Sequence, residues 1–160
     1  MAAAAGAHVV ASARAEDEDR CRTAGATAVA DHRDPSLPAR IRAAAPEGAG
    51  VHIGTSGHHD LETAVGLLAS GGRIVLPAGT DVRAGPPVGP LYVKDGRLLG
   101  FVISNASATD LSRAAATSNR MPADGSLPAR IAGVLPLREA AEAHRRLETG
   151  RVRGRLVLRP

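Results

Sequence analysis

The spacing of three short segments near the N-terminus constrains the fold of this chain more than any other feature. Residues 8–12, HVVAS, have the length and apolar content of a buried strand. The stretch at 15–23 carries acidic residues first and arginines later, a pattern that suits the dipole of a helix. A second short apolar segment lies at 27–30. Strand, helix and strand at this spacing predict two parallel strands joined by a crossover helix.

The alternation of strands and helices continues to about residue 120, and the rhythm changes after about residue 125. Further strands are expected at 51–54, 73–76, 98–103, 130–135 and 155–158, and further helices at 37–45, 59–69, 110–119 and 137–147. Gly71-Gly72 is expected to end the helix at 59–69, and a Gly/Pro-rich loop is expected at 77–90. The pattern predicts an α/β fold with a Rossmann-like, mostly parallel sheet.

A sheet of this kind normally begins with one more strand, which runs into a G-x-G-x-x-G loop. The backbone N–H groups of that loop bind the pyrophosphate of a dinucleotide at a helix N-terminus. Here only Met1–Gly6 precede the first predicted strand, and they resemble the end of a helix. We therefore expect a Rossmann-like sheet that lacks its first strand and its phosphate-binding loop.

Composition argues against several classes of protein. Of the 20 basic residues all but Lys94 are arginines, and they are scattered among acids with few aromatic residues, so no nucleic-acid partner is expected. The single cysteine, Cys21, forms no internal disulfide and no four-ligand zinc site. No apolar run reaches the length of a membrane span, and no signal-peptide pattern is seen. These observations favour a soluble protein of a reducing compartment, the cytoplasm.

Five stretches carry a resemblance to a known family. They are AGAHVVASAR, AGATAVADHRD, GVHIGTSGHHDLETAVGLLASGGRIVLPAG, LYVKDGRLLGFVISN and LPLREAAEAHRRLETGRVRGRLVL. Together they resemble the second half of a medium-chain dehydrogenase/reductase of the zinc-type alcohol dehydrogenase superfamily, closest to the NADPH:quinone oxidoreductase branch. The resemblance implies a partial dinucleotide-binding domain at 1–125. It also implies that the segment at 126–160 returns to a GroES-like catalytic domain that is missing from this chain.

The resemblance implies hydride transfer from NADPH to a quinone or an activated alkene, with the chemistry supplied by the cofactor. No catalytic residue and no zinc ligand is expected from this half, and a homodimer through the strand at 98–103 is implied. The chain departs from the family at Gly54, where an Asp is usual, and at Asp17 and His32, where quinone reductases often have Lys and Tyr. The alternative is a non-catalytic remnant that binds a nucleotide weakly or serves as an interaction module.

Arg14 is the main candidate for choosing between the two nicotinamide cofactors. It follows the first predicted strand directly, and the segment that contains Ser12 and Arg14 has no acid to accept from a ribose 2′-OH. An Arg there can pair with a 2′-phosphate, so NADPH is favoured over NADH. Arg33, after the second strand, is a weaker candidate for the same role. The alternative for both is a solvated surface charge.

The remaining candidates for cofactor binding follow the later strands, whose carboxyl ends are where ligands bind in such sheets. They are Thr55, Ser56 and Gly57; Ala78, Gly79 and Thr80; and Phe101, Val102 and Ile103. In the family the first turn lines a cofactor ribose and the last segment faces the nicotinamide. The alternatives are a helix N-cap for the first turn and plain core packing for the last segment. His58-His59-Asp60 lacks the spacing of common metal motifs, so a polar helix start is favoured there.

The purified 160-residue chain is expected to show negligible oxidation of NADPH in the presence of a quinone. The reason is that the N–H groups that normally bind the pyrophosphate are not among its residues. Loss of NADPH absorbance with time measures this activity. Robust NADPH oxidation by the chain alone would contradict the expectation.

Overall fold

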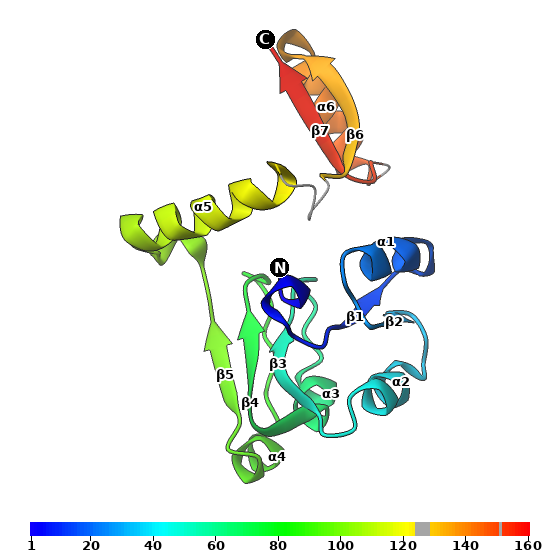
Figure 1. Ribbon diagram of the computed structural model, residues 1–160, viewed down its shortest axis with the longest axis vertical. Coiled ribbons are helices and arrows are strands. Elements are labelled where there is room, and N and C mark those ends of the chain that lie inside the picture. Colours follow the sequence, from blue (N-terminus) through cyan, green and yellow to red (C-terminus); the bar gives the residue numbers. More distant parts are fainter. Residues whose placement is uncertain (124–128, 151) are drawn as a thin grey trace. The chain divides into compact units, whose positions relative to one another are not determined.

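The computed structural model describes residues 1–123, 129–150 and 152–160. These residues form two compact units, Met1–Ala108 and Thr109–Pro160 (Figure 1). The domain boundary expected at 125/126 lies outside the described residues. Each unit is described by itself below.

The N-terminal strand–helix–strand unit forms as its spacing predicts. Strand β1 (Val10–Ala13) pairs in parallel with β2 (Ala28–Asp31), with Ala13 opposite Asp31. The connection contains η2 (Ala15–Asp17) and α1 (Glu18–Thr23), and a further 3-10 turn, η1 (Ala3–Ala5), precedes β1. Helix α2 (Leu37–Ala44) follows, so the expectations for 8–12, 27–30 and 37–45 are confirmed to within two residues.

Three further strands of the first unit form a second parallel sheet in the order β3-β4-β5. They are β3 (Ala49–Ile53), β4 (Leu68–Leu76) and β5 (Arg97–Gly100), connected by α3 (Leu61–Gly66) and α4 (Val88–Val93). Every strand pair that the described residues form is parallel, which confirms the predicted fold class. Among the described strands β1 pairs only with β2 and β3 only with β4, so β1 and β3 do not pair directly.

The core of the first unit forms where α3 packs on one face of the β3-β4-β5 sheet (Figure 1). Ile74 of β4 and Val65 of α3 are 0% and 1% exposed. The cluster is completed by Leu61, Ala64 and Leu68. In register, Ile74 lies between His52 of β3 and Leu98 of β5. Full burial of a Val or Ile side chain stabilises the fold by about 1.5–3 kcal/mol, so this contact holds the middle strand in place.

The junction of α3 and β4 differs from the expectation. The predicted helix at 59–69 is wrong in extent, because α3 ends at Gly66 and β4 already begins at Leu68. The ammonium group of Lys94 ends the helix by donating to the carbonyl oxygens of Val65, Gly66 and Leu68 at 2.9, 3.0 and 2.6 Å. These contacts give a charged donor to carbonyls at the C-terminus of α3 and at the start of β4.

Gly71 and Gly72 lie inside β4 instead of ending the helix, at a shift in the register with β3. Gly71 has a φ of +70°, and its N–H donates to the Lys94 carbonyl at 2.7 Å. A Cβ on Gly72 would lie 2.9 Å from the Ala49 carbonyl oxygen, so the strand can pass here only without a side chain. The two glycines therefore permit an irregular strand that approaches its neighbour closely.

Two further boundaries correct the expectations. The loop expected at 77–90 ends earlier, because α4 begins at Val88. The strand expected at 98–103 ends at Gly100, which is opposite the last residue of β4, Leu76. The chain then turns into η3 (Ile103–Asn105). β4 ends at Leu76, so the apolar segment after Gly100 has no neighbouring strand to pair with. β4 is therefore longer than β5.

The second unit contains a small strand–helix–strand motif of its own. Helix α5 (Ala108–Ala123) precedes β6 (Ile131–Pro136), which pairs in parallel with β7 (Arg155–Arg159) through η4 (Leu137–Glu139) and α6 (Ala140–Glu148). Among its described residues the buried side chains are Leu135 and Ala143, at the contact of β6 with α6. No helix within the described residues is long and apolar enough to cross a membrane.

Replacing Lys94 by Met should lower the free energy of unfolding by about 1.5–3 kcal/mol, because three carbonyl groups lose a charged donor while the apolar stem is kept. Urea denaturation measures the change. The matched control is Arg83→Met, which removes a cation from an exposed loop position and should change stability by less than about 0.5 kcal/mol. Equal stability of Lys94→Met and the unchanged chain would show that Lys94 does not secure this junction.

Candidate functional site

The turns that follow β1 to β4 form the candidate site. In parallel sheets with helical crossovers, ligands bind outside the carboxyl ends of the strands. Ser12, Arg14, Arg33 and the two turns at 55–57 and 78–80 all lie at such ends. The β1–β2 end and the β3–β4 end differ in chemistry, and each is built differently.

Arg14 lies directly after β1, at the β1–β2 end of the site. It occupies the N-cap position of η2 without a side-chain capping bond, and its side chain is exposed, as is that of Ser12. Within the described residues the Arg14 guanidinium makes no hydrogen bond or ion pair, and it forms none with Asp17. The backbone before it is fixed, because Nδ1 of His32 is 3.1 Å from the Ala13 carbonyl oxygen.

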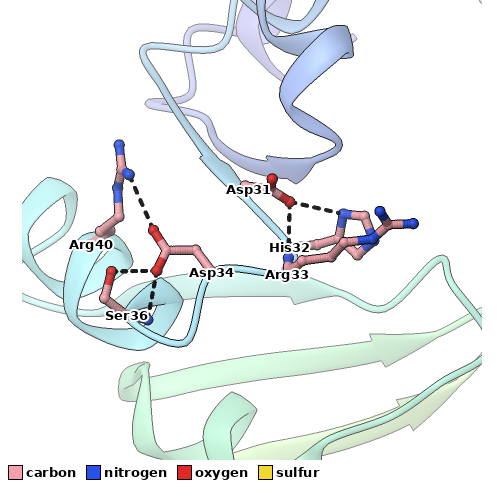
Figure 2. A network of polar contacts seen from close by, with 6 residues as sticks. All are labelled: Asp31, His32, Arg33, Asp34, Ser36 and Arg40. Atoms are coloured by element: carbon pink, nitrogen blue, oxygen red, sulfur yellow. Dashed lines mark hydrogen bonds and ion pairs between the residues drawn. The ribbon is translucent and has the colours of Figure 1, made fainter.

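The segment after β2 carries Arg33, two residues beyond Asp31, as Figure 2 shows. The Asp31 carboxylate accepts from the Arg33 N–H at 2.9 Å and lies 3.5 Å from Nδ1 of His32. One oxygen of the Asp31 carboxylate is therefore engaged within its own turn, whereas the Arg33 guanidinium is exposed and has no ion pair in the described part of the chain. The β1–β2 end thus presents two arginines to solvent and is suited to an anion.

Asp34 fixes the other side of this segment (Figure 2). Its carboxylate accepts from the hydroxyl and the N–H of Ser36 at 2.7 and 2.8 Å, and from Arg40 at 3.2 Å. The hydrogen bonds from Ser36 are the main reason that the pKa of Asp34 is lowered from its ordinary value. This network leads into α2 and has a structural role.

The β3–β4 end brings two of the predicted turns into contact. A Cβ on Gly57, whose φ is +75°, would lie 3.8 Å from the Gly79 nitrogen. The Ser56 hydroxyl contacts the backbone of His58 on both sides, donating to its carbonyl at 3.0 Å and accepting from its N–H at 3.2 Å. Thr55 and Thr80 are exposed, as is Ala78. These turns offer hydroxyls and backbone groups for hydrogen bonds.

His59, expected only as part of a polar helix start, connects the two turns of this end. Its Nε2 lies 2.8 Å from the Ala78 carbonyl oxygen, so it links the turn after β3 to the turn after β4. The expected helix start placed His59 inside a helix, whereas α3 begins two residues later and is capped by Asp60, which accepts from the Thr63 N–H at 2.9 Å. In the sequence, Gly54 and Gly79 are the residues that could have indicated this role, because they leave room for the His59 ring.

Two pKa shifts describe the electrostatics here. Burial, and then the electrostatic interaction with the imidazole of His59, lowers the pKa of His52 from its ordinary value of 6.5. The hydrogen bonds from the side chain and backbone of Thr63 lower the pKa of Asp60. Within the described residues no group of three His, Cys, Asp or Glu side chains could hold a metal ion.

Phe101, Val102 and Ile103 follow β5 and present apolar side chains to solvent. They are 54%, 52% and 61% exposed, so the core packing offered as their alternative role is wrong. The Phe101 N–H donates to the Leu76 carbonyl at 3.1 Å, which places this segment next to the end of β4. An exposed apolar segment beside the polar turns suits a flat, partly apolar group.

Comparison with known proteins identifies the family and agrees with the fold. The family of zinc-binding dehydrogenases matches residues 1–118. No curated protein sequence matches the chain.

Three solved structures illustrate the similarity. An NAD-dependent alcohol dehydrogenase is 30% identical, with a TM-score of 0.77, and the match covers 97% of this chain and 44% of that one. A mycobacterial quinone oxidoreductase is 22% identical, with a TM-score of 0.85 and coverage of 99% and 51%. A mycobacterial structure complexed with NADPH is 22% identical, with a TM-score of 0.77 and the same coverage. The chain spans about half the length of these structures.

Replacing Asp60 by Ala should cost about 1 kcal/mol of stability at neutral pH, because α3 loses its N-cap. The folded-state pKa of Asp60 lies below its ordinary value of 3.8. The charged cap therefore contributes fully above that pH and is lost as the pH falls through the folded-state pKa. Urea denaturation at several pH values should show the difference between the two proteins narrowing only below about pH 4. Asp81→Ala, an exposed loop carboxylate, is the control. A difference that stays constant into strong acid would contradict the role of the charge.

Proposed function

This chain belongs to the zinc-binding dehydrogenase family, and from that premise we propose that it forms the cofactor-binding part of an NADPH-dependent oxidoreductase. The observation that carries the proposal is the exposed, unpaired guanidinium of Arg14 at the end of β1, within the described residues. A ribose 2′-phosphate is the group that distinguishes NADPH from NADH, and a guanidinium binds it through charge-assisted hydrogen bonds.

Sequence identity does not choose between the cofactors. The alcohol dehydrogenase at 30% identity is NAD-dependent, whereas the mycobacterial structure at 22% contains NADPH. The local chemistry favours NADPH, because β1 ends without an acid and one oxygen of the Asp31 carboxylate at the end of β2 already accepts from the Arg33 N–H. Arg33 adds a second positive charge at the same end. The β1–β2 end therefore offers two guanidinium groups to a 2′-phosphate, which NADH lacks.

The rest of the cofactor fits the β3–β4 end. The turns at 55–57 and 78–80 would hold a ribose by hydrogen bonds from hydroxyl and backbone groups. Phe101, Val102 and Ile103 would lie against the nicotinamide and its acceptor, since they are apolar and exposed. When bound, a reduced nicotinamide supplies the hydride, and we propose a quinone or an activated alkene as acceptor. The residues of this chain bind and orient, and none acts as a catalytic acid or base.

The outer edge of β5 suits a second copy of the chain. β5 pairs only with β4 among the described strands, and Leu99 and the segment at 101–103 expose apolar side chains there. An exposed apolar edge strand is prone to pair with another strand, so we propose a homodimer through this edge. The unpaired Cys21 suits a reducing compartment such as the cytoplasm.

Replacing Arg14 by Ala should weaken NADPH binding about tenfold and leave NADH binding unchanged, because one charge-assisted contact to the 2′-phosphate is lost. Titrations of the chain with each cofactor, followed by NMR because binding is expected to be weak, give the two dissociation constants. The matched control is Arg20→Ala, which removes an exposed arginine of α1. An unchanged ratio of the two constants in Arg14→Ala would remove the basis of the NADPH assignment.

A further inference from the structure

The imidazole of His59 fills a space that two glycines create. A Cβ placed on Gly54 would lie 2.9 Å from Nδ1 of His59, and one placed on Gly79 would lie 2.8 Å from Nε2. Atoms at these distances must move apart, so any side chain at either position would displace the ring. Gly54 follows β3 and Gly79 follows β4. The ring is therefore packed between the ends of two neighbouring strands.

The backbone on each side of His59 is held by separate contacts. The Ser56 hydroxyl binds the N–H and the carbonyl of His58. The Asp60 carboxylate binds the N–H of Thr63 and thereby fixes the first turn of α3. Because both neighbours are anchored, the ring of His59 has a defined direction, which points it at the Ala78 carbonyl.

The contact with Ala78 also restricts the chemistry of the ring. A carbonyl oxygen accepts hydrogen bonds and donates none, so Nε2 of His59 carries the hydrogen at 2.8 Å from it. A proton transfer from Nε2 would break this link. Within the described residues no cluster of three suitable side chains supports a metal ligand role either. The geometry suits a residue that holds other groups in position.

We propose that His59 is a positioning residue that fixes the spacing between the turn at 55–57 and the turn at 78–80. Through this spacing it sets the affinity for the nicotinamide half of the cofactor, while the adenosine half depends on Arg14. This inference rests on the proposed function. It predicts that Gly54 and His59 act as a pair, because a side chain at position 54 would have the same effect as loss of the ring contact.

Binding to the 160-residue chain tests this, with NADPH and with adenosine 2′,5′-bisphosphate, which lacks the nicotinamide half. His59→Ala should weaken NADPH binding about three- to tenfold, the effect of one lost hydrogen bond, and leave the bisphosphate unaffected. His59→Gln, which keeps an N–H donor of similar reach, should restore most of the affinity. His58→Ala removes the exposed neighbouring imidazole and should change neither constant.

A double-mutant cycle tests the pairing with Gly54. Gly54→Ala alone should weaken NADPH binding about as much as His59→Ala does. Added to His59→Ala, it should weaken binding no further, because the ring that it displaces is already absent. Additive losses in the double variant would overturn the pairing.

Other results would also overturn the proposal. Equal NADPH affinity of His59→Ala and the unchanged chain would show that the spacing does not matter. An equal loss for NADPH and the bisphosphate would show a general loss of structure. If His59→Ala does not fold, the NADPH affinities of Gly54→Ala and His59→Gln test the proposal instead. Wild-type NADPH affinity in Gly54→Ala would then contradict it. Binding of neither ligand to the unchanged chain would instead overturn the proposed function, and this inference with it.

Discussion

The packing of α3 against β4 is the contact on which the rest of the first unit depends. β4 is the middle strand of the β3-β4-β5 sheet, so the contact that fixes β4 also fixes both neighbours. Ile74 and Val65 meet there with no more than 1% of either residue exposed. Lys94 adds hydrogen bonds, because its ammonium group connects the end of α3 to the segment that leads into β5. The turns after β3 and β4 take their positions from this arrangement.

The parallel topology could be predicted from sequence, whereas several boundaries could not. Segments long enough for a crossover helix separate the strands, and such connections favour parallel pairing. Gly71-Gly72 looks locally like a helix C-terminus, but the helix is ended by Lys94, which is 26 residues from Leu68 along the chain. Likewise the apolar run at 98–103 stops being a strand where its partner β4 stops. Both corrections arise from contacts between distant residues.

In the candidate site, too, some features could be predicted from the sequence and others could not. Arg14 and the turns at 55–57 and 78–80 could be named because strand ends are visible in the sequence and ligands bind there. The role of His59 depends on contacts with Ala78 and Gly79, which reach it only when β3 and β4 lie side by side. It also depends on where α3 begins, and that is set by the cap at Asp60.

The two ends of the site place different demands on geometry. A charge interaction falls off slowly with distance, so an arginine on an exposed loop can find a phosphate without a rigid support. A hydrogen bond weakens steeply when its distance or angle is wrong, so turns that bind by backbone and hydroxyl groups need fixed spacing. This explains why the Arg14 guanidinium makes no hydrogen bond or ion pair within the described residues, while His59 is packed between two glycines. Burial lowers the pKa of the neighbouring His52. The β3–β4 end is organised by the hydrogen bonds of Ser56 and His59 and by the packing of His59 between the two glycines.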